Sequence, residues 1–343
     1  MDFILGIGTL LVVLLAMTLF LKFAPNGKVS LQALSGAACA SFLPEAFLKY
    51  AIGGVFHSEY FIKLGEVAGS LSGVAVGILT CLKFGINPVF AVLTGLVLFD
   101  FKLLPAFIAA YFVAFGIKAL EKYVPEGLDL IVVILLSPAI AYGIASIVSP
   151  SVTAVLKQIG TAITAVGDNN PYALALVIGA IVPVVGMTPL SSMVFTSLLG
   201  LTGIPMAIGA LGCMGSSFVN FMMFRKLRIG NAGKAFAVAV EPLTQIDTIA
   251  KYPIQLYGTN AVVGMVNSLF ITYMGIVVNQ PGMATPIAGP IVALGFNEVV
   301  PTVITIVVVA IISIIMSFFI GTFISKKRPT LDIQVPHVNQ QTN

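Results

Sequence analysis

Long apolar runs, separated by short polar stretches, make up most of the chain. Because the hydrocarbon core of a bilayer is about 30 Å thick, a helix that crosses it needs about 20 apolar residues. Four runs meet this criterion clearly and six more meet it moderately well. The clear runs are 3–23, 129–148, 258–279 and 299–325, and the others are 33–55, 64–83, 86–100, 103–120, 170–186 and 203–224. The pattern predicts an all-α, polytopic membrane protein with about ten transmembrane helices.

One uncharged stretch is too long for a single crossing. The 56 residues from Asn169 to Phe224 carry no charge, and as one helix they would extend roughly 84 Å at 1.5 Å per residue. The segment must therefore fold back, and its stretch VPVVGMTPLSS is rich in Gly, Pro, Ser and Thr. Irregular backbone at membrane depth is tolerated only inside protein or along a water-filled cavity. We expect a discontinuous helix or re-entrant hairpin here; the alternative is a loop outside the membrane, which would normally be more polar.

Two further stretches have the same character. Residues 231–257 are too polar for a lipid-facing helix and too apolar for an ordinary loop, and residues 280–296 are short and interrupted by Gly and Pro. Such interrupted hydrophobic segments are the best indicator in a sequence of a transporter's binding site. The sequence therefore predicts two or three re-entrant or discontinuous segments that together enclose a hydrated site.

Composition supports this interpretation. The chain of 343 residues is 58% hydrophobic and only 9% charged, whereas soluble domains carry about 25% charged residues. Soluble enzymes and disordered scaffolds are excluded on this ground. The net charge of +4 is too small and too scattered for binding along a phosphate backbone, so no nucleic acid is expected as a partner. The expected surroundings are the lipid bilayer.

The sequence lacks the usual signatures of catalysis and metal binding. Cys39, Cys81 and Cys213 lie far apart in apolar runs without a CxxC spacing, which favours small buried hydrophobes over a metal or redox site. The two histidines, His57 and His337, lie in a short polar connection and near the end of the chain. We therefore expect no enzyme activity, no catalytic or metal site and no cofactor.

Acidic residues inside apolar segments are the main candidates for function, because a charge at membrane depth costs about 2.5 kcal/mol or more and usually faces a partner or a cavity. Glu241 and Asp247 lie in the polar stretch EPLTQID within an otherwise apolar segment. With the neighbouring amide and hydroxyl groups they suit a polyhydroxylated or zwitterionic solute, and Glu241 could also accept a coupling proton. Alternatively, backbone N–H groups at a hairpin tip satisfy these carboxylates. The remaining acidic candidates lie near span ends, where an interfacial position is inexpensive, or at a helix start: Glu45, Glu66, Asp100 and Glu298.

Polar residues of the other interrupted segments complete the predicted site. Asn169 and Asn170, in the sequence GDNNP, either contact solute or cap a helix start. Asn260 and Asn267 recur at roughly helical spacing, and they either face the site or join neighbouring helices. The predicted substrate-binding residues are Glu241, Pro242, Thr244, Gln245, Asp247, Asn169, Asn170, Thr188, Asn260 and Thr285.

Basic residues predict the orientation, because Lys and Arg are enriched on the cytoplasmic side of membrane proteins. The clusters at 225–228 and 326–328 are therefore expected in the cytoplasm, together with the polar C-terminal tail. Asp2 before the first run, Lys22 at its end and Lys28 after it predict an external N-terminus. The first run lacks a basic start and a small-residue cleavage site, so it is interpreted as a transmembrane helix and not as a signal peptide.

The stretch from PLTQIDTIAKYPIQLYGTNAVVGMVNSLF to GMATPIAGPIV resembles the membrane (EIIC) component of the sugar phosphotransferase system, and in particular its perfringolysin regulator-like subfamily. The shared pattern is a Gln-containing hairpin, a Lys-x-Pro step, a polar-tipped helix and a Gly-Met-x-Thr element, and it covers roughly 160–300. The resemblance implies a homodimer in the bacterial inner membrane. It also implies a scaffold domain and a moving transport domain with two re-entrant hairpins and a glutamate near the substrate.

On this basis the expected domains are N-terminal helices at 1–150, mainly for scaffold and dimerisation, a transport domain at 151–300, a last transmembrane helix at 301–328 and a polar tail at 329–343. The expected function is transport of a small polar solute, a sugar or an organic anion, by an EIIC-like elevator form of alternating access. The alternative is a membrane sensor or regulator that binds a ligand or partner without transport. Neither histidine has a suitable setting for phosphorylation, so either separate soluble phosphotransferase components supply it, or the protein moves an unphosphorylated solute, or it senses one.

Overall fold

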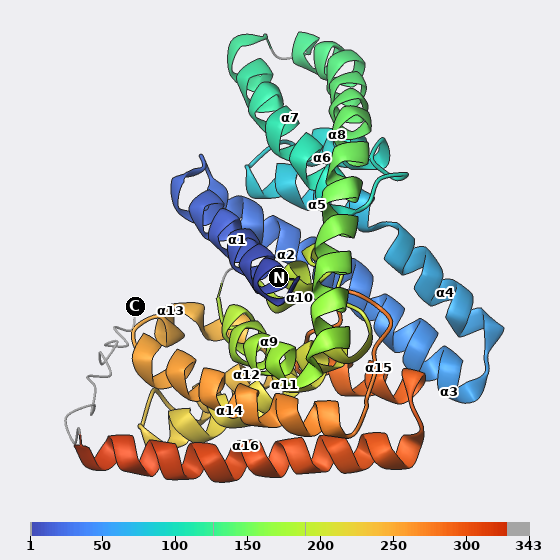
Figure 1. The fold of residues 1–343 in the computed structure, drawn as a ribbon. Coiled ribbons are helices and arrows are strands. Elements are labelled where there is room, and N and C mark those ends of the chain that lie inside the picture. The colour runs from blue at the N-terminus through green and yellow to red at the C-terminus, as the bar shows by residue number, and fades with distance from the viewer. Residues whose placement is uncertain (1, 126, 189, 328–343) are drawn as a thin grey trace.

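The structure is a computed structural model that describes residues 2–125, 127–188 and 190–327. Helices dominate, and no β-strand occurs among the described residues. Figure 1 shows two lobes, one built from the first half of the chain and one from the second, joined by the long helix α8 and by an arm that follows α2. The all-α prediction is confirmed. The predicted tail at 329–343 lies outside the described residues.

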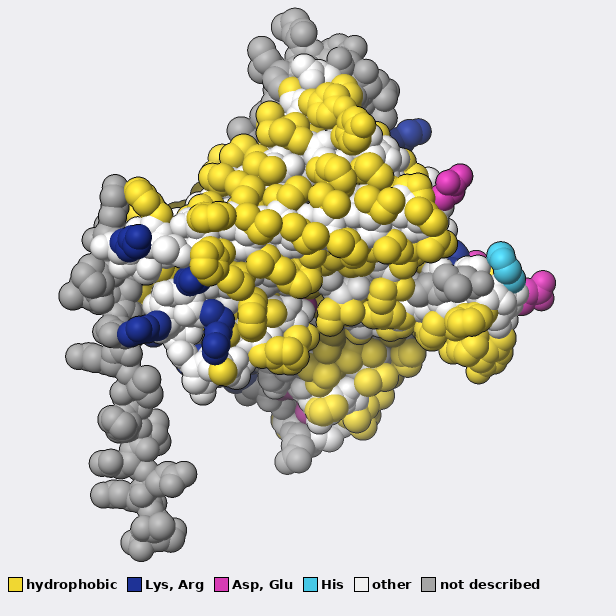
Figure 2. Space-filling view, turned by 90° about the horizontal axis from the view of Figure 1, so that it is seen from below, with side chains coloured by type: hydrophobic (Ala, Val, Ile, Leu, Met, Phe, Trp, Pro, Cys, Tyr) yellow, Lys and Arg dark blue, Asp and Glu magenta, His cyan; other side chains and the backbone are white. Residues whose placement is uncertain are grey.

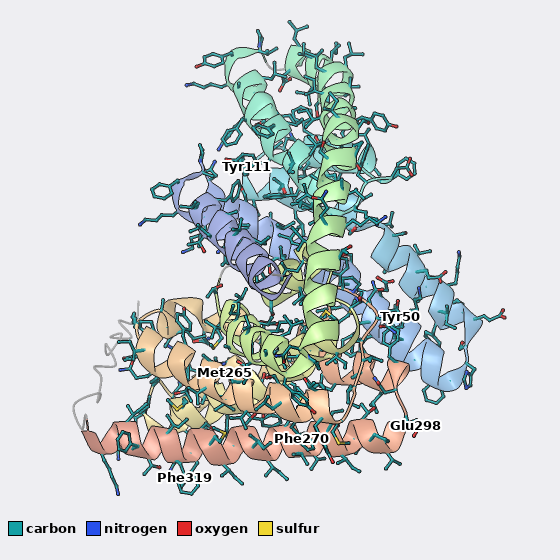
Figure 3. All side chains as sticks on the ribbon, viewed as in Figure 1. Tyr50, Tyr111, Met265, Phe270, Glu298 and Phe319 are labelled. Atoms are coloured by element: carbon teal, nitrogen blue, oxygen red, sulfur yellow. The ribbon has the colours of Figure 1, made fainter. Side chains whose placement is uncertain are left out.

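The N-terminal lobe is a bundle in which α7 and α2 pack against α5, and α8 packs against α1, α6 and α7. Its interior holds a cluster of aromatic rings around Tyr111, which is labelled in Figure 3 and contacts Phe20, Phe84 and Phe107. The Tyr111 hydroxyl donates a hydrogen bond to the carbonyl of Pro25, 2.8 Å away, which satisfies the polar end of a buried ring. The helices are α1 (Asp2–Phe23), α2 (Gly27–Pro44), α5 (Ser72–Lys83), α6 (Pro88–Leu96), α7 (Leu103–Tyr123) and α8 (Leu128–Asn169).

The C-terminal lobe is organised around α11, which packs against α9, α12, α14, α15 and α16. Of its most apolar window, 83% is buried inside the protein, the highest share among the long helices. Small residues permit this: a Cβ at Gly289 would lie 2.6 Å from the Ala210 carbonyl oxygen, so α15 touches the α11 backbone directly. The helices are α9 (Pro171–Val185), α10 (Ser192–Leu198), α11 (Gly203–Lys226), α12 (Ala232–Val240), η2 (Pro242–Gln245), α13 (Ile246–Ile249), α14 (Pro253–Tyr273), α15 (Ala288–Phe296) and α16 (Val299–Lys327).

The arm between the lobes consists of the π-helix η1 (Glu45–Gly53), α3 (Gly54–Phe56) and α4 (Glu59–Ser70). It packs against α15 of the C-terminal lobe. A Cβ at Gly65 would lie 2.6 Å from the Lys49 backbone nitrogen. Glycine at this position therefore lets α4 lie directly on η1.

Six described helices are long and apolar enough to cross a membrane, and the bent pair α4–α5, with a 47° angle, makes a seventh if it counts as one span. The predicted number of about ten is not confirmed. The predicted run at 86–100 contains only the nine-residue α6, and 170–186 contains the fifteen-residue α9; at 1.5 Å per residue these reach about 14 and 23 Å, short of the roughly 30 Å core. Figure 2 shows hydrophobic side chains over most of one face, with Lys and Arg mainly along its left edge, near the end of α16. The chain is thus a multi-pass membrane protein.

Each of the three predicted interruptions is present as a break between helices. The first lies between α9 and α11, where Ser191 has a positive φ of 60° just before the short α10. The second comprises η2 and α13, between α12 and α14. The third is the irregular stretch 274–287, in which Gly282 has a φ of 81°. These breaks position the site described next.

Candidate functional site

The three breaks converge on one cavity, although they are up to about 100 residues apart in the chain. The cavity has a volume of about 20 Å³, which is space for roughly one water molecule. We call it the inner cavity. Its lining residues are Pro183, Gly186, Ser191, Ser192, Met193, Cys213, Ser216, Glu241, Pro242, Ala284, Thr285 and Pro286.

The first break contributes hydroxyl groups. Ser192 opens α10, and its Oγ donates to the carbonyl of Ala284 at 2.7 Å, in a buried hydrogen bond that joins the first break to the third. A Cβ at Gly186 would lie 2.9 Å from Ser192 Oγ, so glycine there gives the serine its space. Thr188 is half-buried, and its hydroxyl donates to the Val185 carbonyl at 2.8 Å. Its side chain thus stabilises the end of α9 and does not line the cavity.

The third break contributes Thr285, which is buried. Its hydroxyl oxygen accepts the backbone N–H of Ala288 at 3.0 Å, a hydrogen bond that satisfies the first N–H of α15. Its own N–H donates to the Met283 carbonyl at 2.9 Å. Both bonds fix the tight backbone that presents Thr285 to the inner cavity.

The second break contributes the carboxylate. Glu241 follows the last residue of α12, its backbone N–H still donates to the Ala237 carbonyl at 2.9 Å, and its half-buried side chain lines the cavity. Pro242 then prevents continuation of the α-helix, because it lacks an N–H donor. The carboxylate also lies within electrostatic range of the thiols of Cys39 and Cys213. The break therefore carries a charge into a wall otherwise made of hydroxyl, thiol and apolar groups.

Behind the cavity, a chain of buried hydrogen bonds links α11 to α14. The amide of Asn220 donates to Ser216 Oγ at 3.2 Å, and the amide of Asn260 donates to Asn220 Oδ1 at 2.8 Å. Asn260 also donates to the Leu256 carbonyl at 2.9 Å, while its own Oδ1 is buried without a hydrogen-bond partner. Asn260 thus joins two helices and supports the cavity wall from two hydrogen bonds away.

The predicted site residues occupy different places. Glu241, Pro242 and Thr285 line the inner cavity. Thr188 lies in the first break, which also contributes lining residues, but its own side chain is not part of the lining. Asn170 is exposed and accepts the N–H of Ala173 at 3.1 Å, so it caps α9 away from the cavity. Asn260 lies behind the cavity wall, and Gln245 is half-buried but does not line the cavity. The side chains of the last three predicted residues, Asn169, Thr244 and Asp247, fall outside the described part of the structure.

Nine of the twelve lining residues are absent from the predicted substrate-binding residues, and Ser192, Met193, Cys213 and Ser216 are among them. Ser192 ends the stretch VPVVGMTPLSS, so a signal for it was present in the predicted break. Cys213 is buried, as expected of a cysteine in an apolar run, but it also faces the cavity. Met193 and Ser216 gave no such signal, because they lie in runs that are typical of helix packing.

The arrangement suits a polar ligand held by hydrogen bonds. A carboxylate and several hydroxyls face one another across a buried space, where such bonds are stronger than in water. Within the described residues, no group of three or more His, Cys, Asp and Glu side chains is placed to hold a metal ion. The inner cavity is accordingly a candidate solute site.

Comparison with known proteins gives one strong result. No curated protein sequence matches the chain. The profile of the family described as "Phosphotransferase system, EIIC" matches residues 29–334 and therefore covers both lobes and all three breaks. EIIC domains are membrane permeases related to sugar transport. The chain belongs to the phosphotransferase-system EIIC family.

Proposed function

We propose that this protein carries a small polar solute of the sugar class across the cell membrane by alternating access. The observation that supports it most directly is the convergence of three broken segments on one cavity that contains the Glu241 carboxylate. Discontinuous helices that meet in this way form the solute site of many transporters. We further propose that the breaks lie within the membrane as re-entrant segments.

The movement would be of the elevator type, with one lobe shifting against the other. In this proposal residues 1–150 form the scaffold and dimerisation domain, and residues 151–300 form the transport domain. The two lobes in Figure 1 are compatible with that division. The last helix, α16, packs against α11 and α14, so we expect it to move with the transport domain.

Orientation and partners complete the proposal. The basic ends of α11 and α16 would face the cytoplasm, with the N-terminus outside, and the protein would act as a homodimer. Separate soluble phosphotransferase components would phosphorylate the solute if uptake is coupled to phosphorylation. The narrower resemblance, to the perfringolysin regulator-like subfamily, is part of the proposal.

Counterflow in proteoliposomes tests the transport function. Purified protein is reconstituted, loaded with one unlabelled sugar at a time (glucose, N-acetylglucosamine or cellobiose), and uptake of the same radiolabelled sugar is followed. We expect counterflow of at least one sugar, and its loss in Glu241→Gln. The matched control is Glu298→Gln, because Glu298 is an exposed acid before α16 that lies outside the inner cavity (Figure 3). Equal counterflow in both variants would exclude Glu241 from the site.

A regulatory function on the same fold is the second candidate. The small volume of the inner cavity, about 20 Å³, favours it, because no sugar fits there without a movement of the breaks. A sensor would bind the sugar, measured by calorimetry on the detergent-solubilised protein, without any counterflow. Counterflow that the parent protein shows and that Glu241→Gln loses supports the carrier instead.

A further inference from the structure

A second, much larger cavity lies on the other side of the residues that close the inner one. Its volume is about 1220 Å³, and we call it the outer cavity. Two segments separate the cavities. In α10, Ser192 and Met193 line the inner cavity, whereas Ser197 and Leu198 line the outer one. In the third break, 284–286 line the inner cavity, whereas Gln280 and Pro281 line the outer one.

The charges of the outer cavity balance. Three acidic and three basic side chains line it, so its wall favours neither an anion nor a cation as ligand. Aromatic and aliphatic groups, among them Phe42, Phe99 and Phe101, alternate with hydroxyls. Such a mixture suits a neutral polyhydroxylated ring, whose hydroxyls accept and donate hydrogen bonds while its C–H faces pack on apolar groups. The six charged residues are Glu45, Lys49, Glu66, Asp100, Lys102 and Lys157.

Among the three of these residues that form ion pairs with one another, Glu45, Lys49 and Glu66, the side chain of Glu45 is the least exposed. Its side chain is only 12% exposed, and its ion pair with Lys49 is long, at 3.9 Å. Lys49 lies closer to Glu66, at 3.4 Å. A side chain at Gly69 would collide with the Glu45 carboxylate, so glycine there makes room for it. The structure thus holds a carboxylate in the cavity wall whose cationic partner is shared with another acid.

Gln280 connects this carboxylate to the inner cavity's wall. Its amide Nε2 donates to Glu45 Oε2 at 3.4 Å, and its Oε1 accepts the Tyr50 hydroxyl at 3.0 Å. Tyr50, labelled in Figure 3, lies on η1, where the arm meets the C-terminal lobe. Since Gln280 lies in the third break, the two bonds attach that break to η1.

We infer that the outer cavity is the first binding site of the solute, a neutral sugar, and that Glu45 binds its hydroxyls in competition with Gln280. This inference rests on the proposed transport function and adds a second site to it. A sugar hydroxyl on a carboxylate makes a charge-assisted hydrogen bond of about 2.6 Å, which is stronger than the 3.4 Å contact with the Gln280 amide. Sugar binding therefore releases Gln280, and the third break becomes free to move away from Ser192.

Cysteine protection tests the binding site directly. Ser70 is exposed and lines the outer cavity, and Ser70→Cys introduces a thiol there. His57→Cys is the matched control, since His57 is exposed on the arm but outside the cavity. Both variants are reacted in detergent with the water-soluble reagent methanethiosulfonate ethylsulfonate, with glucose, N-acetylglucosamine or cellobiose added. We expect that one of these sugars, at about ten times its dissociation constant, slows labelling of Ser70→Cys about tenfold and leaves His57→Cys unchanged.

A second variant separates this site from the inner one. Glu45→Gln in the Ser70→Cys background should raise the concentration of the same sugar needed for half-maximal protection about tenfold, because the charge-assisted bond is lost. Glu241→Gln should leave it unchanged. If the sugar binds by calorimetry but never slows the labelling of Ser70→Cys, the outer cavity is not its site, whatever counterflow shows. If the reagent does not label Ser70→Cys at all, the cavity is filled by lipid and the inference is wrong. Protection without counterflow would instead refute the carrier function and leave the outer site standing.

Discussion

The closest contact between α9 and α14 offers a direct test of how the site is held. Gly179 on α9 faces Gly264 on α14, and a Cβ at Gly264 would collide with the Gly179 carbonyl oxygen. A Cβ at Gly179 would in turn lie 2.5 Å from the Gly264 carbonyl oxygen, whereas ordinary contacts begin near 3.4 Å. The obstacle on each side is backbone, which cannot rotate away as a side chain can. Gly264→Ala therefore forces the two helices apart, and α9 leads directly into the first break.

The expected loss follows from two opposed terms. Overpacking a tight interface costs typically about 1–3 kcal/mol, and a collision with backbone belongs near the upper end. Alanine is a better helix former than glycine by about 1 kcal/mol. We thus expect Gly264→Ala to lose about 2 kcal/mol of stability, together with solute binding at the inner cavity.

Thermal unfolding of the detergent-solubilised protein measures this loss. Unfolding is monitored by the exposure of buried thiols as the temperature rises. The matched control is Gly258→Ala on the same helix, because no heavy atom lies within 4 Å of a Cβ built there. The control keeps the helix propensity gain and lacks the collision, so its melting temperature should be equal to or above that of the parent protein. If Gly264→Ala and Gly258→Ala have the same melting temperature, the contact between Gly179 and Gly264 does not hold α9 in place and the reasoning is wrong.

Three further outcomes are expected. In a double-mutant cycle with Asn220→Leu and Asn260→Leu, thermal unfolding should reveal a coupling energy of about 0.6–1.7 kcal/mol, as found for buried hydrogen bonds between membrane helices. Strictly additive losses of stability would argue against the hydrogen bond between Asn260 and Asn220. Ser192→Ala removes the donor to the Ala284 carbonyl, so it should lower stability by about 1 kcal/mol, and an unchanged melting temperature would contradict this role. The thiol of Cys213 is buried, and it should react with maleimide only after denaturation in detergent, as mass spectrometry of the labelled peptides would show.

Much of the helical order could be predicted from apolar runs, because such a run must be helical to satisfy its backbone in lipid. The run predicted at 203–224 corresponds to α11 at 203–226, and 299–325 corresponds to α16 at 299–327. The lengths were harder to predict. The run at 129–148 continues as α8 to Asn169, through Pro138 and Pro150, since hydropathy marks where apolar residues end and not where a helix ends.

The lining of the candidate site was predictable where its chemistry interrupts an apolar segment. Glu241 and Pro242 stand out in the sequence because a carboxylate and a proline are both costly inside a membrane helix. Ser216 does not, because one serine in a run of small residues looks the same whether it packs or lines a cavity. Asn260 was ambiguous for a related reason: helical spacing places it on one face, and only the three-dimensional contact with Asn220 shows what that face meets.

The small volume of the inner cavity determines which contacts must break first when a solute enters in the proposed transport cycle. A space of about 20 Å³ cannot admit a sugar, so the segment between the cavities, 280–286, must move first. Three side-chain hydrogen bonds hold it: the partly exposed bonds of Gln280 with Glu45 and Tyr50, and the buried bond from Ser192 to the Ala284 carbonyl. Water and solute compete for the exposed contacts, whereas nothing competes for the buried one until the segment has shifted. In the proposed mechanism, release at Gln280 therefore precedes release at Ser192, and the solute occupies the outer cavity before the inner cavity opens.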